Sequence, residues 1–511
     1  MLNKYYVTCK QNPSKQSLGL QKMYKNTGTE PKMANLPYFL DGTLNINNRW
    51  VKLAAIIPWT DVEEIYALNF TSHTGPKALP ARVAFGSLII QVKLSLTDEE
   101  TVEMISENPY LQYFLGFERY KQESPFDPSM MTHFRKRFGA QDIKDIDELL
   151  HKATRPKEED SDNNSDNDPP SNKGALIVDA SCVPADIHYP TDLGLLNKAR
   201  EKTEEIIDIL WRHRSNTEEK VKPRTYREDG RKSFLSIVLK KRVSKKKRRE
   251  VINKQLHCVR RNLESIDKLK KYADLALLKP NLYRELLVIG TLYQQQQYMY
   301  DNKVTSVDDR IVSIHQPHIR PIVRGKAGAH TEFGAKISVS VVDGWTFIDT
   351  ISFDSYNEGT ELISQIEKYK ERFGYYPEST HADKIYRTKE NRAYCKKHGI
   401  RISGPSLGRP PKDENLRKEQ KEIQRQDEAI RNEVEGCFGV AKRRYKLDRI
   451  FTKISASSET LIALVFMVMN LDKAITFLSF FGQLLTLLLK HVFNFISLIS
   501  QDEHLKRRVI Q

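Results

Sequence analysis

The sequence predicts an α/β protein in which a small all-α domain comes first and a helical, basic insertion interrupts the main α/β domain. Three observations support this fold class. Residues 81–118 repeat their apolar positions at helical spacing. Residues 174–184 and 334–353 instead form apolar runs of strand type, and Asp343-Gly344 supplies a hairpin turn within the second run. Between these strand regions, residues 193–329 return to a helical pattern that is rich in Lys and Arg.

Composition favours a folded protein with a polyanionic partner. The chain has 511 residues, of which 39% are hydrophobic and 29% charged, and its net charge is +16. Residues 220–271 account for nearly all of this excess, with 20 Lys and Arg against five Asp and Glu. Such a concentration of positive charge indicates nucleic acid before a membrane surface.

Cysteine usage and hydropathy predict a cytoplasmic protein associated with the nucleoid, with no membrane partner. None of the five cysteines has CxxC spacing, so neither a zinc site nor a disulfide framework is indicated. The N-terminal sequence MLNKYYVTCKQNPSK lacks the apolar core of a signal peptide. The longest apolar run, 474–489, is shorter than the roughly 20 residues that a membrane span requires.

The N-terminal part divides into a loosely ordered segment, 1–47, and a helical domain, 48–150. Thr60 with Glu63 and Thr97 with Glu100 have the spacing of capping boxes, so each pair predicts a helix start. Residues 127–138, DPSMMTHFRKRF, predict a basic helix with Pro128 at its first position. Its charge is compatible with a solvated face or with a domain that binds DNA ends, and we expect the second.

Residues 151–173 form an acidic linker, EEDSDNNSDNDPPSN, and the α/β domain begins directly after it. That domain comprises 174–192 and 330–473. Its first strand, GALIVDASCVP, delivers Asp179 to a sheet edge. Asp186 and Asp192 follow closely, but they lie in a proline-containing stretch that predicts a loop. Asp343 lies in a turn, where an Asp needs no functional role.

The insertion, 193–329, is predicted to consist of basic helices. Such a charge run is a solvated helix face or a sequence-independent tether to phosphates, and Lys-rich runs are poorly suited to base readout. Its end, HQPHIRPIVRGKA, has two histidines without an acid or Cys at ligand spacing, so we expect a polar loop there. Arg324 and Lys326 make a phosphate-contacting loop the second possibility.

After the hairpin, the pattern predicts a helix over 359–373 and a short strand over 379–385 that brings Asp383 to its end. A helix over 391–398 stops at Gly399, and a further short strand follows. The next helix contains Glu435. Residues 474–511 form an apolar helical tail.

The helix with Glu435 places one acid between two cations. Arg431, Glu435 and Lys442 lie within about 40° of one line along a helix, and the segment continues into Arg443 and Arg444. This arrangement suits a metal-binding acid beside a polyanion. Glu433 remains the alternative third acid, although it points about 200° away from Glu435 on a helix.

This order of elements is that of an RNase H-like fold, whose active site is built from three carboxylates at these places. Phosphodiester chemistry at such sites uses two metal ions about 4 Å apart. Hard cations such as Mg²⁺ require oxygen ligands, which carboxylates supply.

Three segments carry a family resemblance: LIVDASCVPADIHYPTDLGLLNKARE, HADKIYRTKENRAYCKKHGIRISG and RNEVEGCFGVAKRRYKLDRI. They resemble the catalytic blocks of bacterial insertion-sequence DDE transposases of the group called IS-five. The segment NRWVKLAAIIPWTDVEEIYA and residues 81–138 resemble the N-terminal region of that group. The last block fits the group's spaced Tyr, Arg, Glu and Lys signature at Arg431, Glu435 and Lys442, whereas Glu428 stands in the place of the Tyr.

The resemblance implies that Asp179, Asp383 and Glu435 bind two Mg²⁺ ions, for which Mn²⁺ can substitute, and that Lys442 contacts transposon-end DNA. It implies a transposase that binds terminal inverted repeats, cuts with metal-activated water, and attacks target DNA with the freed 3′-hydroxyl. Pairing of two ends implies at least a homodimer. The residues expected to bind DNA are Arg431, Lys442, Arg443, Arg444, Arg324 and Lys326.

Three alternatives remain open from the sequence: a catalytically inactive transposase-derived DNA-binding protein, a metal-dependent nuclease without strand transfer, and a membrane-associated structural protein. Cleavage at inverted repeats would exclude the inactive DNA-binding protein. Joining of a cut end to a target plasmid would exclude the nuclease, and fractionation into the soluble pool would exclude the membrane-associated protein.

Overall fold

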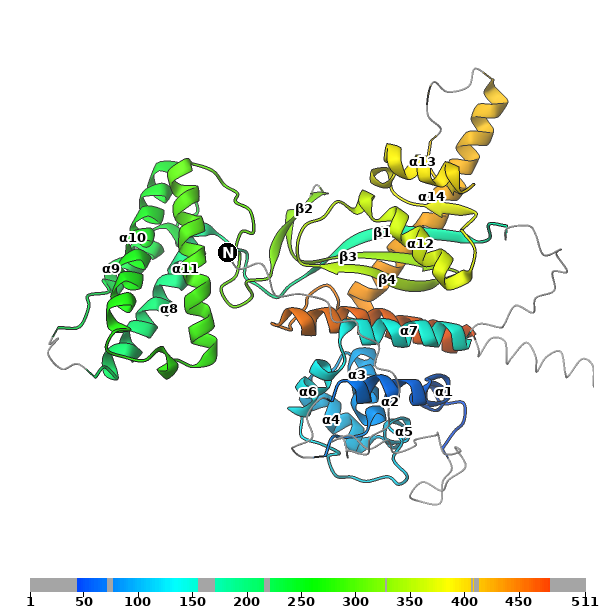
Figure 1. Ribbon diagram of the computed structural model, residues 1–511, viewed down its shortest axis with the longest axis horizontal. Helices are drawn as coiled ribbons and strands as arrows, with labels where there is room; N and C mark the ends of the chain where they lie inside the picture. The colour runs from blue at the N-terminus through cyan, green and yellow to red at the C-terminus, as the bar shows by residue number, and fades with distance from the viewer. Residues whose placement is uncertain are drawn as a thin grey trace, which may run out of the picture. The chain divides into compact units, whose positions relative to one another are not determined.

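The computed structural model describes residues 44–70, 77–154, 171–215, 221–326, 329–405, 408 and 413–477, with the side chains of 324–330 outside this description. Two compact units make up the chain (Figure 1). The first contains residues up to 90 together with 97–138, and the second contains 91–96 and everything from 139 onward.

The first unit is helical, as its apolar spacing predicted. Its core is aromatic: Trp50 and Trp59 both pack on Phe114, with ring centroids 5.2 and 5.5 Å apart, and Tyr66 stacks on Phe138 at 5.0 Å. All five side chains are buried, so the unit has its own core. Its helices are α1 (Arg49–Ile56), α2 (Trp59–Leu68), α3 (Ala81–Leu94), α4 (Asp98–Glu107), α5 (Pro109–Phe114) and α6 (Met130–Arg137).

Of the two predicted capping boxes, one is confirmed and one is wrong. Thr97 and Glu100 bond reciprocally at the start of α4. Thr60, in contrast, lies inside α2, because that helix begins at Trp59, directly after Pro58. The Trp59 indole donates a buried hydrogen bond to the Ala54 carbonyl, which holds the start of the helix in place. Helix α6 also begins later than expected, at Met130.

The second unit is built on a mixed sheet whose described strands run in the order β2-β3-β1-β5-β6, with β4 paired to β3. Strand β3 pairs antiparallel with β1, β2 and β4, whereas β5 pairs parallel with β1 and with β6. The Asp343-Gly344 hairpin is confirmed, with positive φ at both residues. The strands are β1 (Ala175–Pro184), β2 (Arg320–Lys326), β3 (Ala329–Val342), β4 (Trp345–Ser352), β5 (Ser379–His381) and β6 (Arg401–Ile402).

Helices cover this sheet and bring distant segments to it. Gln365 of α12 bonds to Ser338 of β3 and Asp349 of β4, whereas Cys437 of α14 contacts Thr346 of β4. The sheet helices are α7 (Ala140–Thr154), α12 (Leu362–Phe373), α13 (Lys389–Lys397), α14 (Glu414–Arg444) and the helix Ser455–Phe477.

Two domain boundaries differ from those predicted from the sequence. The helical domain was expected to end at 150, but α7 belongs to the second unit. Its His151 packs edge-on against Trp345 and Phe347 of β4, so its apolar face is buried by the sheet. The segment expected to be a polar loop after His318 becomes strand β2, so the insertion ends before Arg320 rather than at 329. Pairing with the long β3 overrides its Pro- and Gly-rich composition.

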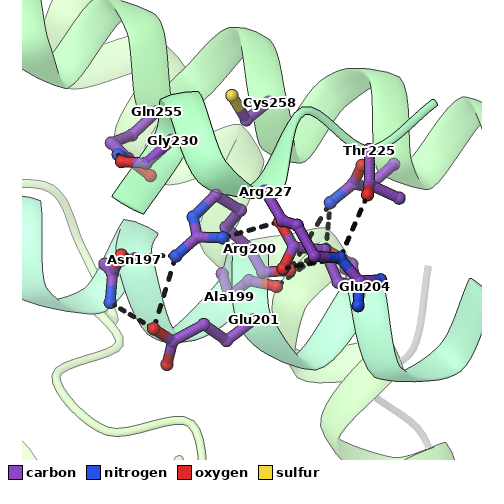
Figure 2. Close-up of polar contacts among 12 residues, drawn as sticks. Asn197, Ala199, Arg200, Glu201, Glu204, Thr225, Arg227, Gly230, Gln255 and Cys258 are labelled. Atoms are coloured by element: carbon purple, nitrogen blue, oxygen red, sulfur yellow. Dashed lines mark hydrogen bonds and ion pairs between the residues drawn. The ribbon is translucent and has the colours of Figure 1, made fainter. Parts of the chain in front are cut away.

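The described part of the insertion contains the α-helices α8 (Asp192–Arg212), α9 (Arg227–Val238), α10 (Lys245–Leu269) and α11 (Pro280–Asn302). One stripe of α10, including Leu256 and Val259, is buried against α8 and α11, while its basic residues lie outside this stripe. Arg200 of α8 is the largest fully buried side chain described (Figure 2). Its guanidinium bonds to Glu204 at 2.6 Å and to Asn197 at 2.9 Å.

Among the described residues, one helix, Ser455–Phe477, is long and apolar enough to cross a membrane. Two thirds of its apolar window is buried inside the protein, which is what a core helix also shows. Most of the predicted tail, 474–511, lies outside the described residues.

A stability prediction arises at Gly334, which faces Pro184 where β3 and β1 pair. A Cβ there would overlap the Val183 carbonyl oxygen and lie 2.8 Å from the Pro184 Cα, so backbone would have to move. We expect Gly334→Ala to lower the free energy of unfolding by about 1–3 kcal/mol, measured by urea denaturation. The control is Gly290→Ala in α11, where a Cβ meets nothing within 4 Å, and this change should stabilise by about 0.5–1 kcal/mol. If both substitutions changed the free energy of unfolding equally, the close approach of the backbones at Gly334 would not affect stability.

Candidate active site

Asp179 lies half-buried in the middle of β1, two residues beyond the last pair that β1 makes with β5. The predicted place at a sheet edge is therefore wrong, because β1 continues past Asp179 and pairs with β3 as far as Pro184. Burial raises the pKa of its carboxyl to about 6, the Ala180 backbone N–H opposes this shift, and the nearby charges of Glu358 and Asp383 raise it further. Arg431 lowers the pKa of Asp179. These neighbours come from four different parts of the second unit, so Asp179 is where they converge.

Asp383 follows β5 directly and caps the short helix Lys384–Tyr386 through the Lys384 backbone N–H. In the β1–β5 register, Ile177 pairs with His381. Asp383 lies two residues beyond this pair, past the end of β5, and it is close enough to Asp179 to raise the pKa of that carboxyl. The structure thus brings two of the three predicted acids close together, just past the point where β5 ends beside β1.

Arg431 connects the third predicted acid to this pair. Its guanidinium lies 3.3 Å from the Asp383 carboxylate and 3.3 Å from the Glu435 carboxylate, one turn along α14. Both acids are 55% exposed at the side chain, against 29% for Arg431. The three side chains therefore form a chain of charges, acid–cation–acid, at the protein surface just past the end of β5.

The two candidate glutamates of α14 lie on different sides of the helix. Glu433 approaches the Gly344 turn of the hairpin, and it lines a largely apolar cavity of about 1490 Å³ together with Trp345 and Val440. Glu435 instead faces Arg431 and, through it, Asp383. The choice of Glu435 as the third acid, which was made from helix spacing, stays a prediction.

The predicted DNA-binding cations are divided between these two sides. Lys442 donates to the Ser181 hydroxyl of β1 at 3.1 Å, two residues from Asp179 and so on the same face of the strand. Arg443 is exposed. Arg444 pairs with Asp472 at 3.0 Å and lines the apolar cavity, so it lies away from the acids. Arg324 and Lys326 belong to β2, but their side chains lie outside the described part of the structure.

A network that the sequence did not reveal holds α14 to the sheet. The buried Asp427 accepts two hydrogen bonds from Arg401 of β6, at 2.8 and 3.0 Å. His381 of β5 lies 3.3 Å from the same carboxylate, and burial lowers the pKa of this imidazole. The helical phase of Asp427, one turn before Arg431, gives no signal by itself, because its partners come from distant strands.

Glu358 was also missed. It lies in the short helix Glu358–Thr360 before α12, its carboxylate pairs with Lys336 at 3.2 Å, and it is close enough to Asp179 to raise the pKa of that group. A single acid in a loop carries no spacing signal, so only the fold could place it beside β1.

Asp179, Asp383 and Glu435 carry carboxylate oxygens, which are the donors that a hard divalent cation prefers. The described residues nevertheless contain no group of three acid, His or Cys side chains close enough to hold an ion together. The guanidinium of Arg431 instead pairs with two of the acids, Asp383 and Glu435.

Removing the charge of Asp179 should stabilise the fold while removing a candidate ligand. The folded-state pKa of about 6 exceeds the ordinary value of 3.8, so the folded protein binds this proton more tightly than the unfolded chain does. The charged form therefore costs stability above pH 6, and this cost disappears as the pH falls towards 4. We expect Asp179→Asn to raise Tm by a few degrees at about pH 8 and not at about pH 4. Asp448→Asn, at an exposed position, is the control and should leave Tm nearly unchanged.

Two family models match the chain. A model described as a transposase DDE domain matches residues 380–472, which include Asp383, Arg431, Glu435 and Lys442. A model described as a transposase domain (DUF772) matches residues 39–137. The uncharacterized protein ORF8 in the nfe locus of Rhizobium meliloti is 33% identical over 174 residues, which are 34% of this chain and 76% of that protein. No solved structure matches.

Proposed function

Because the chain belongs to the insertion-sequence transposases, we propose that it binds the terminal inverted repeats of its element, cleaves DNA there with bound metal ions, and joins the cut ends to target DNA. The membership of the IS-five group and the RNase H-like identity of the second unit are parts of the same proposal. The antiparallel β3–β1 pair followed by parallel β5 and β6 supports the latter.

The observation that carries the proposal is that Arg431 lies beside two of the proposed acids, one of which lies near the third. Asp383 is close enough to raise the pKa of Asp179, and Arg431 lies 3.3 Å from both Asp383 and Glu435. These acids come from positions 256 residues apart in sequence at the extremes, so a purely local structural role does not account for their convergence. Carboxylates next to guanidinium and ammonium groups suit a site for a metal-bound phosphodiester.

In this proposal, Asp179, Asp383 and Glu435 hold Mg²⁺ or Mn²⁺. Bound there, the ions activate the attacking oxygen and stabilise the leaving oxygen of the phosphodiester. Lys442 lies on the same face of β1 as Asp179 and provides a positive charge for the DNA backbone. Arg431 offers a planar fork of donors that matches a phosphate group. The protein's contribution is thus to position the scissile phosphate and to stabilise its charge.

The insertion supplies affinity rather than chemistry in this proposal. Lys245, Lys246, Lys247 and Arg248, in the first turn of α10, are exposed. Exposed charges of this kind bind the phosphate backbone without reading bases, and their contribution falls as salt rises. We propose that α10 tethers the DNA, and that a homodimer or larger assembly pairs the two ends at the nucleoid, in the cytoplasm and without a membrane.

The decisive experiment uses the purified full-length chain and DNA that carries one end of its element, recognised as a short inverted repeat in the flanking sequence. We expect Mg²⁺- or Mn²⁺-dependent cleavage at the repeat, followed by joining of that end to a supercoiled target plasmid. Binding to the repeat without any cleavage in either metal would favour the inactive DNA-binding alternative. Cleavage without joining would favour a nuclease.

A further inference from the structure

Arg431 occupies the space between two proposed metal ligands, and this suggests a role beyond contacting DNA. Resting on the proposed function, we propose that Arg431 is a gate: it holds Asp383 and Glu435 in ion pairs until a DNA phosphate takes up its guanidinium, and only then do both acids become available to metal. Metal and DNA would therefore load cooperatively.

The contacts of Arg431 support competition with a metal ion. One guanidinium nitrogen lies 3.3 Å from an Asp383 oxygen and the other 3.3 Å from a Glu435 oxygen, so one side chain engages both acids at once. A divalent cation bound to those oxygens would lie a few ångströms from a permanent positive charge, and the two charges repel each other. The ion pairs and the metal therefore compete for the same carboxylates.

These ion pairs are not needed to attach α14 to the sheet. One turn earlier, the buried Asp427 is bonded twice to Arg401 and lies beside His381. Two turns after Glu435, Lys442 bonds to Ser181. Because α14 is anchored on both sides of Arg431, its guanidinium can change partner without releasing the helix.

A phosphodiester is the group most suited to open the gate. The guanidinium fork matches two phosphate oxygens in a bidentate arrangement, as it matches a carboxylate. The Arg431 side chain is 29% exposed and that of its partner Asp383 is 55% exposed, so a DNA backbone can reach the guanidinium while the protein stays folded. By linkage, if DNA strengthens metal binding, then metal strengthens DNA binding by the same factor.

The test measures Mn²⁺ binding to the full-length protein by calorimetry at about pH 8, where a carboxyl with a pKa of about 6 is ionised. Without DNA, we expect Arg431→Gln to bind Mn²⁺ on the order of tenfold more tightly than the wild type. Arg425→Gln is the matched control. Arg425 is 78% exposed on the same helix and pairs with Glu422, so the same loss of charge there should leave the Mn²⁺ affinity nearly unchanged.

Addition of a mixed-sequence DNA duplex should then tighten Mn²⁺ binding by the wild type, and much less so by Arg431→Gln. Arg431→Lys, which keeps the charge but loses the fork, should lie between the two proteins. Circular dichroism of each variant confirms that it is folded. The proposal is wrong if Arg431→Gln binds Mn²⁺ no more tightly than the wild type, or if the duplex strengthens Mn²⁺ binding equally in both proteins. Failure of DNA cleavage alone would instead count against the proposed function, since the binding measurement needs no turnover.

Discussion

Glu435→Gln is expected to abolish metal-dependent DNA cleavage, lowering its rate by about 10³-fold or more, because it removes a charged metal ligand while keeping the side chain's size. A neutral amide oxygen binds a hard cation much less strongly than a carboxylate does. The measurement is single-turnover cleavage of a labelled inverted-repeat end. Asp179→Asn and Asp383→Asn should behave in the same way, because they remove the other two proposed acids.

Glu433→Gln is the matched control for this prediction. It makes the same chemical change two residues away on the same helix, but Glu433 faces the Gly344 turn and the apolar cavity rather than Arg431. Its cleavage rate should stay within about threefold of the wild type, as for most surface substitutions. The reverse pattern, with Glu433→Gln inactive and Glu435→Gln active, would show that the third acid is wrongly assigned.

The second large effect is expected in the insertion, where Glu204→Ala should lower the local free energy of unfolding by about 3–5 kcal/mol. The side chains of Arg200 and Glu204 are only 2% and 8% exposed, and their 2.6 Å ion pair is buried between α8, α9 and α10 (Figure 2). Burial raises the pKa of Glu204 despite the opposing effect of the Arg200 guanidinium. Removing Glu204 leaves the buried Arg200 charge without its closest carboxylate.

Hydrogen exchange of the α8 and α10 amides is the measurement, since it reports this part of the chain separately from the others. Glu201→Ala is the control: Glu201 also contacts Arg200, at 3.3 Å, but it is 56% exposed, so its loss should cost less than about 1 kcal/mol. The double change Arg200→Met with Glu204→Leu should destabilise less than Glu204→Ala alone, since no buried charge is left unpaired. Equal protection in Glu204→Ala and Glu201→Ala would contradict the role given to burial.

The sequence by itself determined the elements whose signals are local. The Asp343-Gly344 turn defines the hairpin because few other residue pairs tolerate positive φ at both positions. Helix spacing placed Arg431, Glu435 and Lys442 on one side of α14 and Glu433 on another, since a helix has a fixed angle per residue. The apolar spacing of the first unit and the basic helices of the insertion were likewise predictable from periodicity.

The tertiary structure alone decided which distant groups meet. Only the fold brings Asp383 near Asp179, and only the docking of α14 brings Arg431 to Asp383. Glu358 and the Asp427–Arg401 network had no local signature, and β2 was hidden because its strand character comes from pairing with β3. The physical reason is the same in each case. Periodicity and turn chemistry act over a few residues along the chain, whereas ion pairs, burial and strand pairing depend on distances in space that the fold creates.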